Sequence, residues 1–107
     1  MTLDDLFQVV VLQYNALNRK FEESDDATEM AKLLDEMKEF SHRLDLIQRK
    51  RAENISKSIN RFTDDLKAAN SKLTKSLKDL SDLNALVKAC SVFLGVVDQA
   101  IDLLKLV

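Results

Sequence analysis

Apolar residues recur every three or four positions through the first part of the chain, which is the spacing of one side of an α-helix. The residues of this stripe are Leu3, Leu6, Phe7, Val10, Tyr14, Leu17 and Phe21. Thr2 stands where a helix N-cap is expected, and Asp5 stands where the acid of a capping box belongs. The stripe is widened by further apolar residues, namely Val9, Val11 and Leu12. The pattern predicts a helix over residues 3–22 that is covered on more than one side.

A run of polar residues from Glu22 to Asp26 predicts the end of this first helix. Asp26 is followed three residues later by Glu29, which is typical of a new helix start. A second helical stripe then consists of Met30, Leu33, Leu34, Met37, Phe40, Leu44 and Ile47. We predict a second helix over residues 27–51.

The strongest pattern is a seven-residue repeat in the second half of the chain. Its first position holds Ala52, Ile59, Leu66, Leu73, Leu80, Val87, Leu94 and Ile101. Its fourth position holds Ile55, Phe62, Ala69, Ser76, Leu83, Cys90, Val97 and Leu104. Fifteen of these 16 positions are apolar, which is typical of coiled-coil packing. The predicted interaction seam consists of the larger residues: Ile55, Ile59, Phe62, Leu66, Leu73, Leu80, Leu83, Val87, Leu94, Val97, Ile101 and Leu104.

A helix that carried this whole repeat would be far longer than the first two. An unbroken helix over residues 54–106 would span ~80 Å, against roughly 30 and 37 Å for its neighbours. It could bend back at 69–72 or 81–84, or its exposed seam could meet another chain. The repeat continues through both bends, which favours the second outcome. We expect an all-α single domain over residues 1–107, an elongated helical bundle or coiled-coil-like fold with two shorter helices and one long helix, continuous or broken once.

The composition agrees with long amphipathic helices. There is no proline and one glycine, and 46% of the residues are hydrophobic while 32% are charged. The net charge of −2 disfavours nucleic acid as a partner. The single cysteine excludes an intrachain disulfide and favours a reducing, cytoplasmic location. The N-terminus lacks the basic start of a signal peptide, and the apolar run over residues 89–97 is too short to span a bilayer.

The chain contains one spacing that resembles a metal-binding motif. Glu39 and His42 have the Glu-x-x-His spacing of di-iron helical bundles, which places both side chains on one face of a helix. Such a centre needs two motifs, whereas this chain supplies one. Phe40 and Leu44 define the buried face, and His42 lies off it, so a solvated histidine is the favoured interpretation.

Two further features have simple structural interpretations. Cys90 falls on the seam, where a thiol packs as a small apolar residue, and no base lies next to it in the sequence. A basic cluster surrounds the end of the second helix and could contact phosphates, but it is interpreted as a solvated turn. Its residues are Arg43, Arg49, Lys50, Arg51, Lys57 and Arg61. We therefore predict no catalytic residue, no metal ligand and no cofactor.

The most apolar part of the chain is residues 83–107. Apolar residues also lie outside the seam there: Leu86, Val92, Phe93, Val96, Leu103 and Leu106. Packing within the chain ranks first as their explanation, a protein partner second and a membrane surface third. Asp98 and Asp102 interrupt the apolar face and disfavour membrane docking.

These patterns indicate a non-enzymatic helical protein–protein interaction module. It would act as an oligomer, or as an adaptor, inhibitor or chaperone-like protein that presents a coiled-coil seam to a helical partner. The alternative is a membrane-active helical protein that inserts its apolar C-terminal segment into lipid. A third hypothesis is a metal-dependent oxidase centred on Glu39 and His42.

Overall fold

Helices account for almost all of the described chain, which confirms the all-α prediction. The computed structural model describes residues 1–53 and 59–105, without the side chains of residues 104 and 105. Its elements are α1 (Leu3–Glu23), α2 (Ala27–Ala52), the short 3₁₀ helix η1 (Asn60–Phe62), α3 (Thr63–Lys78) and α4 (Leu83–Lys105).

The first two helices begin where side chains satisfy their free backbone N–H groups. Thr2 and Asp5 form a reciprocal capping box, in which the Asp5 N–H donates to Thr2 Oγ1 at 3.2 Å and the Thr2 N–H donates to Asp5 Oδ2 at 3.0 Å. Asp26 caps α2 by accepting a hydrogen bond from the Glu29 N–H at 2.8 Å. These local signals place both helix starts where the sequence predicts them.

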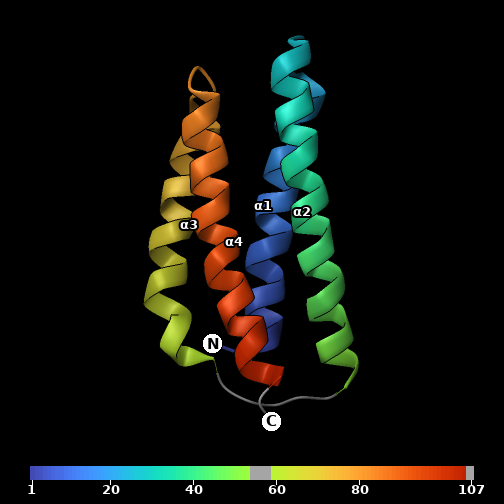
Figure 1. Ribbon diagram of the computed structural model, residues 1–107, viewed down its shortest axis with the longest axis vertical. Helices are drawn as coiled ribbons and strands as arrows, with labels where there is room; N and C mark the ends of the chain where they lie inside the picture. Colours follow the sequence, from blue (N-terminus) through green and yellow to red (C-terminus); the bar gives the residue numbers. More distant parts are fainter. Residues whose placement is uncertain (54–58, 106–107) are drawn as a thin grey trace.

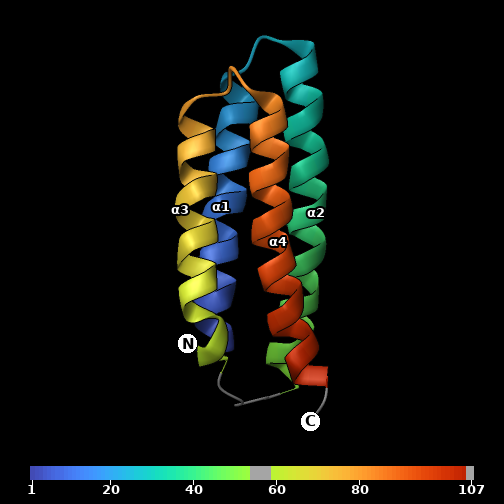
Figure 2. The ribbon, with the colours of Figure 1, turned by 60° about the vertical axis from the view of Figure 1, so that its left-hand side comes forward.

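The four α-helices run side by side in an elongated body of 44 × 24 × 17 Å (Figures 1 and 2). Successive helices alternate in direction. Helix α1 packs against α2 and α3, and α4 packs against α3 and α2, so α2 and α3 lie diagonally opposite. Two adjacent pairs are therefore parallel: α1 with α3, and α2 with α4. The Ile59 N–H donates to the Met1 carbonyl at 3.2 Å. This bond holds the residue before α1 and its N-cap beside the residue that precedes η1 and α3.

The long helix predicted over residues 54–106 is divided, and this corrects the preference for a continuous helix with an exposed seam. Helix α3 ends at Lys78 and α4 begins at Leu83, next to the second of the two predicted bends. Asp79 Oδ1 accepts hydrogen bonds from the N–H and the hydroxyl of Ser81. Asp82 Oδ1 accepts one from the Ala85 N–H at 3.1 Å and so caps α4. These two aspartates favour a turn over further helix. Residues 54–58 lie outside the described part of the chain.

Much of the predicted seam lies in the core between helices of this chain. Seam residues buried there are Ile59, Phe62, Leu66, Leu73, Leu94, Val97 and Ile101. Half-buried are Leu80, Leu83 and Val87. Ile55 and the Leu104 side chain lie outside the described residues. In α4 the buried side is wider than the seam, because Leu86 and Phe93, one position before the repeat, are fully buried as well.

Candidate functional site

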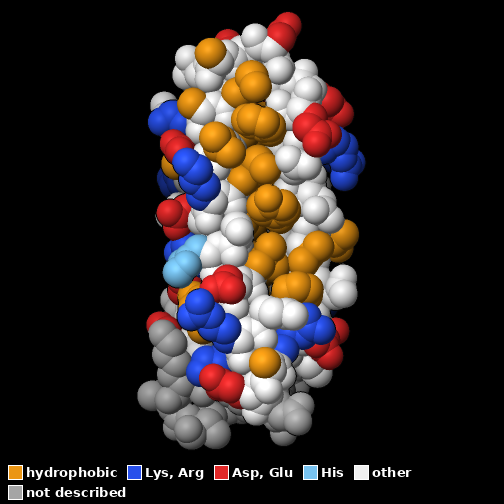
Figure 3. Space-filling model, turned by 90° about the vertical axis from the view of Figure 1, so that its right-hand side faces the viewer, with side chains coloured by type: hydrophobic (Ala, Val, Ile, Leu, Met, Phe, Trp, Pro, Cys, Tyr) orange, Lys and Arg blue, Asp and Glu red, His pale blue; other side chains and the backbone are white. Residues whose placement is uncertain are grey.

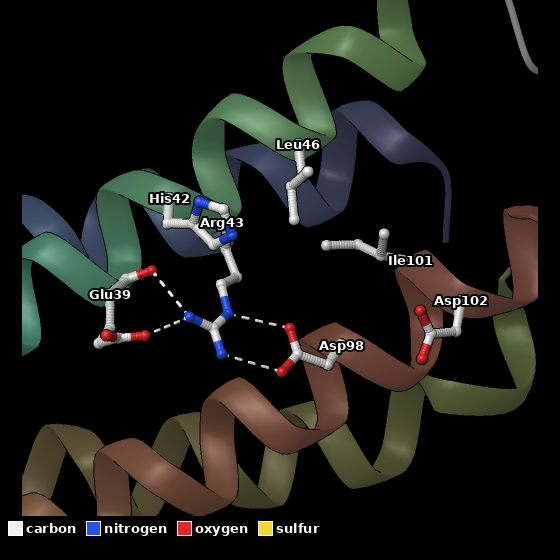
Figure 4. A pocket seen from close by; sticks show the side chains of 7 residues that line it. All are labelled: Glu39, His42, Arg43, Leu46, Asp98, Ile101 and Asp102. Atoms are coloured by element: carbon white, nitrogen blue, oxygen red, sulfur yellow. Dashed lines mark hydrogen bonds and ion pairs between the residues drawn. The ribbon is translucent and has the colours of Figure 1, made fainter.

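A polar cleft of about 540 Å³ lies between α2 and α4. Figure 4 shows its lining residues, which are Glu39, His42, Arg43, Leu46, Asp98, Ile101 and Asp102. Four of the seven are charged, which makes this the first place to look for site chemistry.

Arg43 is the centre of the cleft. Its Nε and Nη2 donate to the two carboxylate oxygens of Asp98 at 2.9 and 3.0 Å, and its Nη1 donates to the carboxylate of Glu39. The Arg43 side chain is only 17% exposed. The hydrogen bond to Asp98, followed by that to Glu39, raises the pKa of Arg43 above its usual value despite its burial. The Arg43 guanidinium is held between two carboxylates. The main role of these charged side chains is therefore to link α2 to α4, and not to supply a reactive group.

The Glu39–His42 pair does not form a converging metal site. Figure 4 shows the Glu39 carboxylate directed at Arg43, and His42 is exposed at the rim. Over the described ranges 1–53 and 59–105, no group of three or more His, Cys, Asp and Glu side chains could hold a metal ion.

Cys90 lies inside the core and has a carboxylate neighbour that sequence reasoning missed. Burial, together with the charge of Glu36 and a hydrogen bond to it, raises the pKa of the Cys90 thiol far above its usual value. Burial also raises the pKa of the Glu36 carboxyl, against the hydrogen bond from Cys90. A thiol in this state is a poor nucleophile. Glu36 lies one helical turn before the buried Phe40. This spacing could have identified Glu36 in the sequence as a residue at the edge of the buried side of α2.

The basic cluster is distributed over several local contacts. Arg49 pairs with Asp45 at 2.9 Å, and Arg51 pairs with Asp4 at 2.8 Å. The Arg51 guanidinium also lies over the ring of Phe7, 4.4 Å from its centroid. The other described members of the cluster also contact residues close to them: Lys50 contacts Glu53, Arg61 contacts Phe62, and Arg43 contacts Asp98. The cluster therefore does not gather into one phosphate-sized site among the described residues.

An apolar stripe runs along the side of the molecule formed by α1 and α2 (Figure 3). Leu34 is 39% exposed on this side. By their helical positions, the half-buried residues of the stripe are Phe7, Val11 and Tyr14 from α1 and Met30 and Leu44 from α2. His42, the pale blue side chain in Figure 3, lies beside the stripe and not within it.

The outer side of α1, towards α3, is also uncharged over most of its length. Residues 6–18 include no charged residue, so more than three turns of α1 are neutral on every side. Leu12 points outward and is 65% exposed. It borders an opening of about 250 Å³ between the helices, and a second opening of about 350 Å³ adjoins it at Val9 and Asn70. Helix α1 packs against both α2 and α3, in line with the expectation that it is covered on more than one side, but the side that carries Leu12 stays uncovered.

One buried amide connects α1 to α3 behind these openings. The Gln13 Nε2 donates to Asn70 Oδ1 at 2.6 Å and to Thr74 Oγ1 at 3.1 Å. Gln13 is only 5% exposed, so these bonds offset the cost of burying a polar side chain. Sequence reasoning did not single out this residue, although a glutamine one helical turn from Val10 and Leu17 lies at the edge of the buried side.

The C-terminal helix turns most of its large apolar side chains inward. Leu86, Phe93 and Val97 are fully buried, while Val92 is exposed. Within the described chain, no helix combines the length and the apolarity needed to cross a bilayer. No protein family, no curated protein and no solved structure was found to match this chain.

Proposed function

We propose that this protein is a non-enzymatic helical interaction module that contacts another helical protein through the uncovered apolar surface of α1. One observation carries the proposal: α1 is uncharged from residue 6 to 18, and Leu12 on its outer side is 65% exposed. As parts of the same proposal, the contact has coiled-coil character, the protein forms an oligomer or binds as an adaptor, inhibitor or chaperone, and it acts in the cytoplasm.

The physical argument concerns what the outer side of a bundle helix normally carries. A helix on the surface of a bundle is expected to place charged and polar residues towards solvent. Covering apolar surface is worth about 25 cal/mol for each Å² removed from water. A second helix laid along α1 would gain this energy from Leu12 and Val9 without unfolding the core. The buried seam residues of α3 and α4, in contrast, could meet another chain only if the bundle opened.

The test compares variants at two exposed apolar positions with one exposed polar control. Leu12→Glu and Leu34→Glu each place a charge on the apolar surface of α1 or α2. Gln99→Glu places the same charge on the outer side of α4, where the native residue is polar and exposed. Light scattering with chemical crosslinking measures self-association, and pull-down measures partner capture.

The proposal expects an assembly, or a captured helical partner, that Leu12→Glu removes and Gln99→Glu keeps, and Leu34→Glu tests whether the contact extends onto α2. A compact particle that stays monomeric at every concentration and captures no protein would overturn it. Flotation with phosphatidylcholine and phosphatidylserine vesicles provides the opposing result. If Leu12→Glu and Leu34→Glu abolish vesicle binding and no protein partner is found, the surface would be assigned to lipid instead.

A further inference from the structure

We infer that the outer side of α1 binds a second copy of this chain, forming an antiparallel dimer with its two-fold axis at Leu12. This inference rests on the proposed function and specifies its partner. The outer side of α1 has an ordered stripe with helical spacing: Asp5, Gln8, Leu12, Ala16 and Arg19. All of these residues are exposed except Ala16, which is half-buried.

The stripe is complementary to itself when it is reversed. In two antiparallel copies crossing at Leu12, Asp5 of one copy faces Arg19 of the other, and Gln8 faces Ala16. Opposite charges therefore meet at both ends of the contact, and its centre is neutral. A parallel arrangement would instead bring like charges together, so the charges select the antiparallel one.

The surface beside Leu12 has the shape that such a contact needs. Val9, Leu12, Gln13 and Ala16 follow the i, i+3, i+4, i+7 spacing of a coiled-coil hole. They line the opening of about 250 Å³, whose remaining walls come from Asn70 and Thr74 of α3. The small side chain of Ala16 leaves this space unfilled. In the two-fold symmetric dimer, the Leu12 side chain of the second copy inserts into this opening as the knob of a coiled-coil contact.

Existing hydrogen bonds and charges leave this surface available. The Gln13 amide is held by Asn70 and Thr74, so it does not occupy the opening. Hydrogen bonds from Thr2 lower the pKa of Asp5, which is therefore ionised at neutral pH. Arg19 is exposed and has no ion pair among the described residues, whereas Lys20 is 4.0 Å from its own Glu23.

The size of the surface sets the strength of the dimer. Helix α1 has 21 residues and is about 31 Å long at 1.5 Å per residue. One helix and the adjoining edge of α3 offer less than the roughly 800 Å² per partner of a standard stable interface. The dimer is therefore weak, with dissociation in the micromolar to millimolar range. Its exposed ion pairs set orientation more than affinity.

The first experiment is sedimentation velocity of the intact chain from micromolar to millimolar concentration. The wild type is expected to pass from monomer to dimer. Leu12→Glu places two carboxylates at the axis and is expected to weaken dimerisation at least tenfold. Leu34→Glu, a matched change on the neighbouring apolar stripe, should leave dimerisation unchanged. Circular dichroism verifies that both variants keep the helical fold, because both positions are exposed.

The second experiment tests the antiparallel register by disulfide trapping. A mixture of Gln8→Cys and Ala16→Cys chains should form mixed disulfides under mild oxidation, whereas Gln8→Cys alone should not. Leu12→Cys should link to itself. The native Cys90 is buried and does not compete.

A chain that remains monomeric at millimolar concentration overturns the inference. So does a dimer that Leu12→Glu leaves intact, or one in which Gln8→Cys links mainly to itself. If such a result is found while Leu12→Glu removes capture of another helical protein, the proposed function stands and only the identity of the partner is wrong.

Discussion

The two parallel helix pairs of this molecule are built from different side chains. Between α2 and α4, the rings of Phe40 and Phe93 stack with their centroids 5.4 Å apart, and Arg43 binds Asp98 through two hydrogen bonds. Between α1 and α3, one glutamine amide bridges the helices, beside two openings at the surface. Both pairs leave an opening at the surface, but the opening between α2 and α4 is lined mainly by charged side chains, whereas Val9, Leu12 and Leu66 border the openings between α1 and α3.

This difference suggests that the α2–α4 pair contributes mainly to stability and the α1–α3 pair mainly to recognition. Large buried rings and a shielded ion pair hold α2 to α4 and leave little apolar surface for a partner. Between α1 and α3, the small side chain of Ala16 borders an opening that it does not fill. We therefore expect substitutions on the α2–α4 side to change mainly the free energy of unfolding. Substitutions on the outer side of α1 should change mainly association.

The largest effect is expected from Phe93→Ala. Phe93 is fully buried against Phe40, and removing such a ring costs about 3–5 kcal/mol of unfolding free energy. Urea denaturation followed by circular dichroism measures the loss, and Phe93→Leu gives a milder variant if the alanine variant does not fold. The comparison on the other side is Leu66→Ala, which borders the larger α1–α3 opening. A loss at Leu66 that exceeds the loss at Phe93 would contradict the contrast between the two pairs.

A middle-sized effect is expected from Arg43→Ala. The variant leaves Asp98 without its two hydrogen bonds, but Asp98 is 43% exposed and water can replace part of them. We expect a loss of about 1–2 kcal/mol, below the cost of breaking a fully buried pair. Arg43→Lys keeps the charge and should recover only part of this loss, because lysine cannot form the bidentate contact. Equal stability of Arg43→Ala and the wild type in urea denaturation would show that the ion pair contributes nothing.

The smallest effect concerns Glu36 and depends on pH. Because burial raises its pKa in the folded state, the folded chain binds this proton more tightly than the unfolded chain does. Stability therefore falls as pH rises from about 4.5 through the raised pKa, and the loss persists at neutral pH. Glu36→Gln should be slightly more stable than the wild type at neutral pH, and this gain should disappear in acid.

The control for this effect is Asp25→Asn, which removes an exposed charge that does not act on Glu36. Thermal unfolding of both variants between pH 4 and pH 8 makes the comparison. An equal gain in Asp25→Asn would attribute the effect to net charge and not to burial of Glu36.

Local signals in the sequence predicted local structure well. The caps at Thr2 and Asp26 placed the starts of α1 and α2, because a cap depends on residues three positions apart. The break between α3 and α4 was harder to place. The seven-residue repeat runs through it without interruption, and an apolar pattern records which side is buried but not whether the helix continues. The aspartates at 79 and 82 decide the turn through their own hydrogen bonds.

The candidate sites depend on contacts that the sequence does not display. Arg43 and Asp98 are 55 residues apart, and only the parallel placement of α2 and α4 brings them together. Glu36 and Cys90 meet for the same reason. The widened stripe of α1 was visible in the sequence, yet only the packing shows that Leu12 is the part that stays uncovered.

Because the single cysteine is buried, the rate at which it reacts reports local opening of the folded chain. Cys90 has no exposed surface, and its burial among α2 and α4 side chains keeps the thiolate form scarce. A thiol-specific dye can therefore react only during moments when this part of the molecule separates. The labelling rate, followed with increasing urea, would give the free energy of local opening beside that of global unfolding, without introducing any probe.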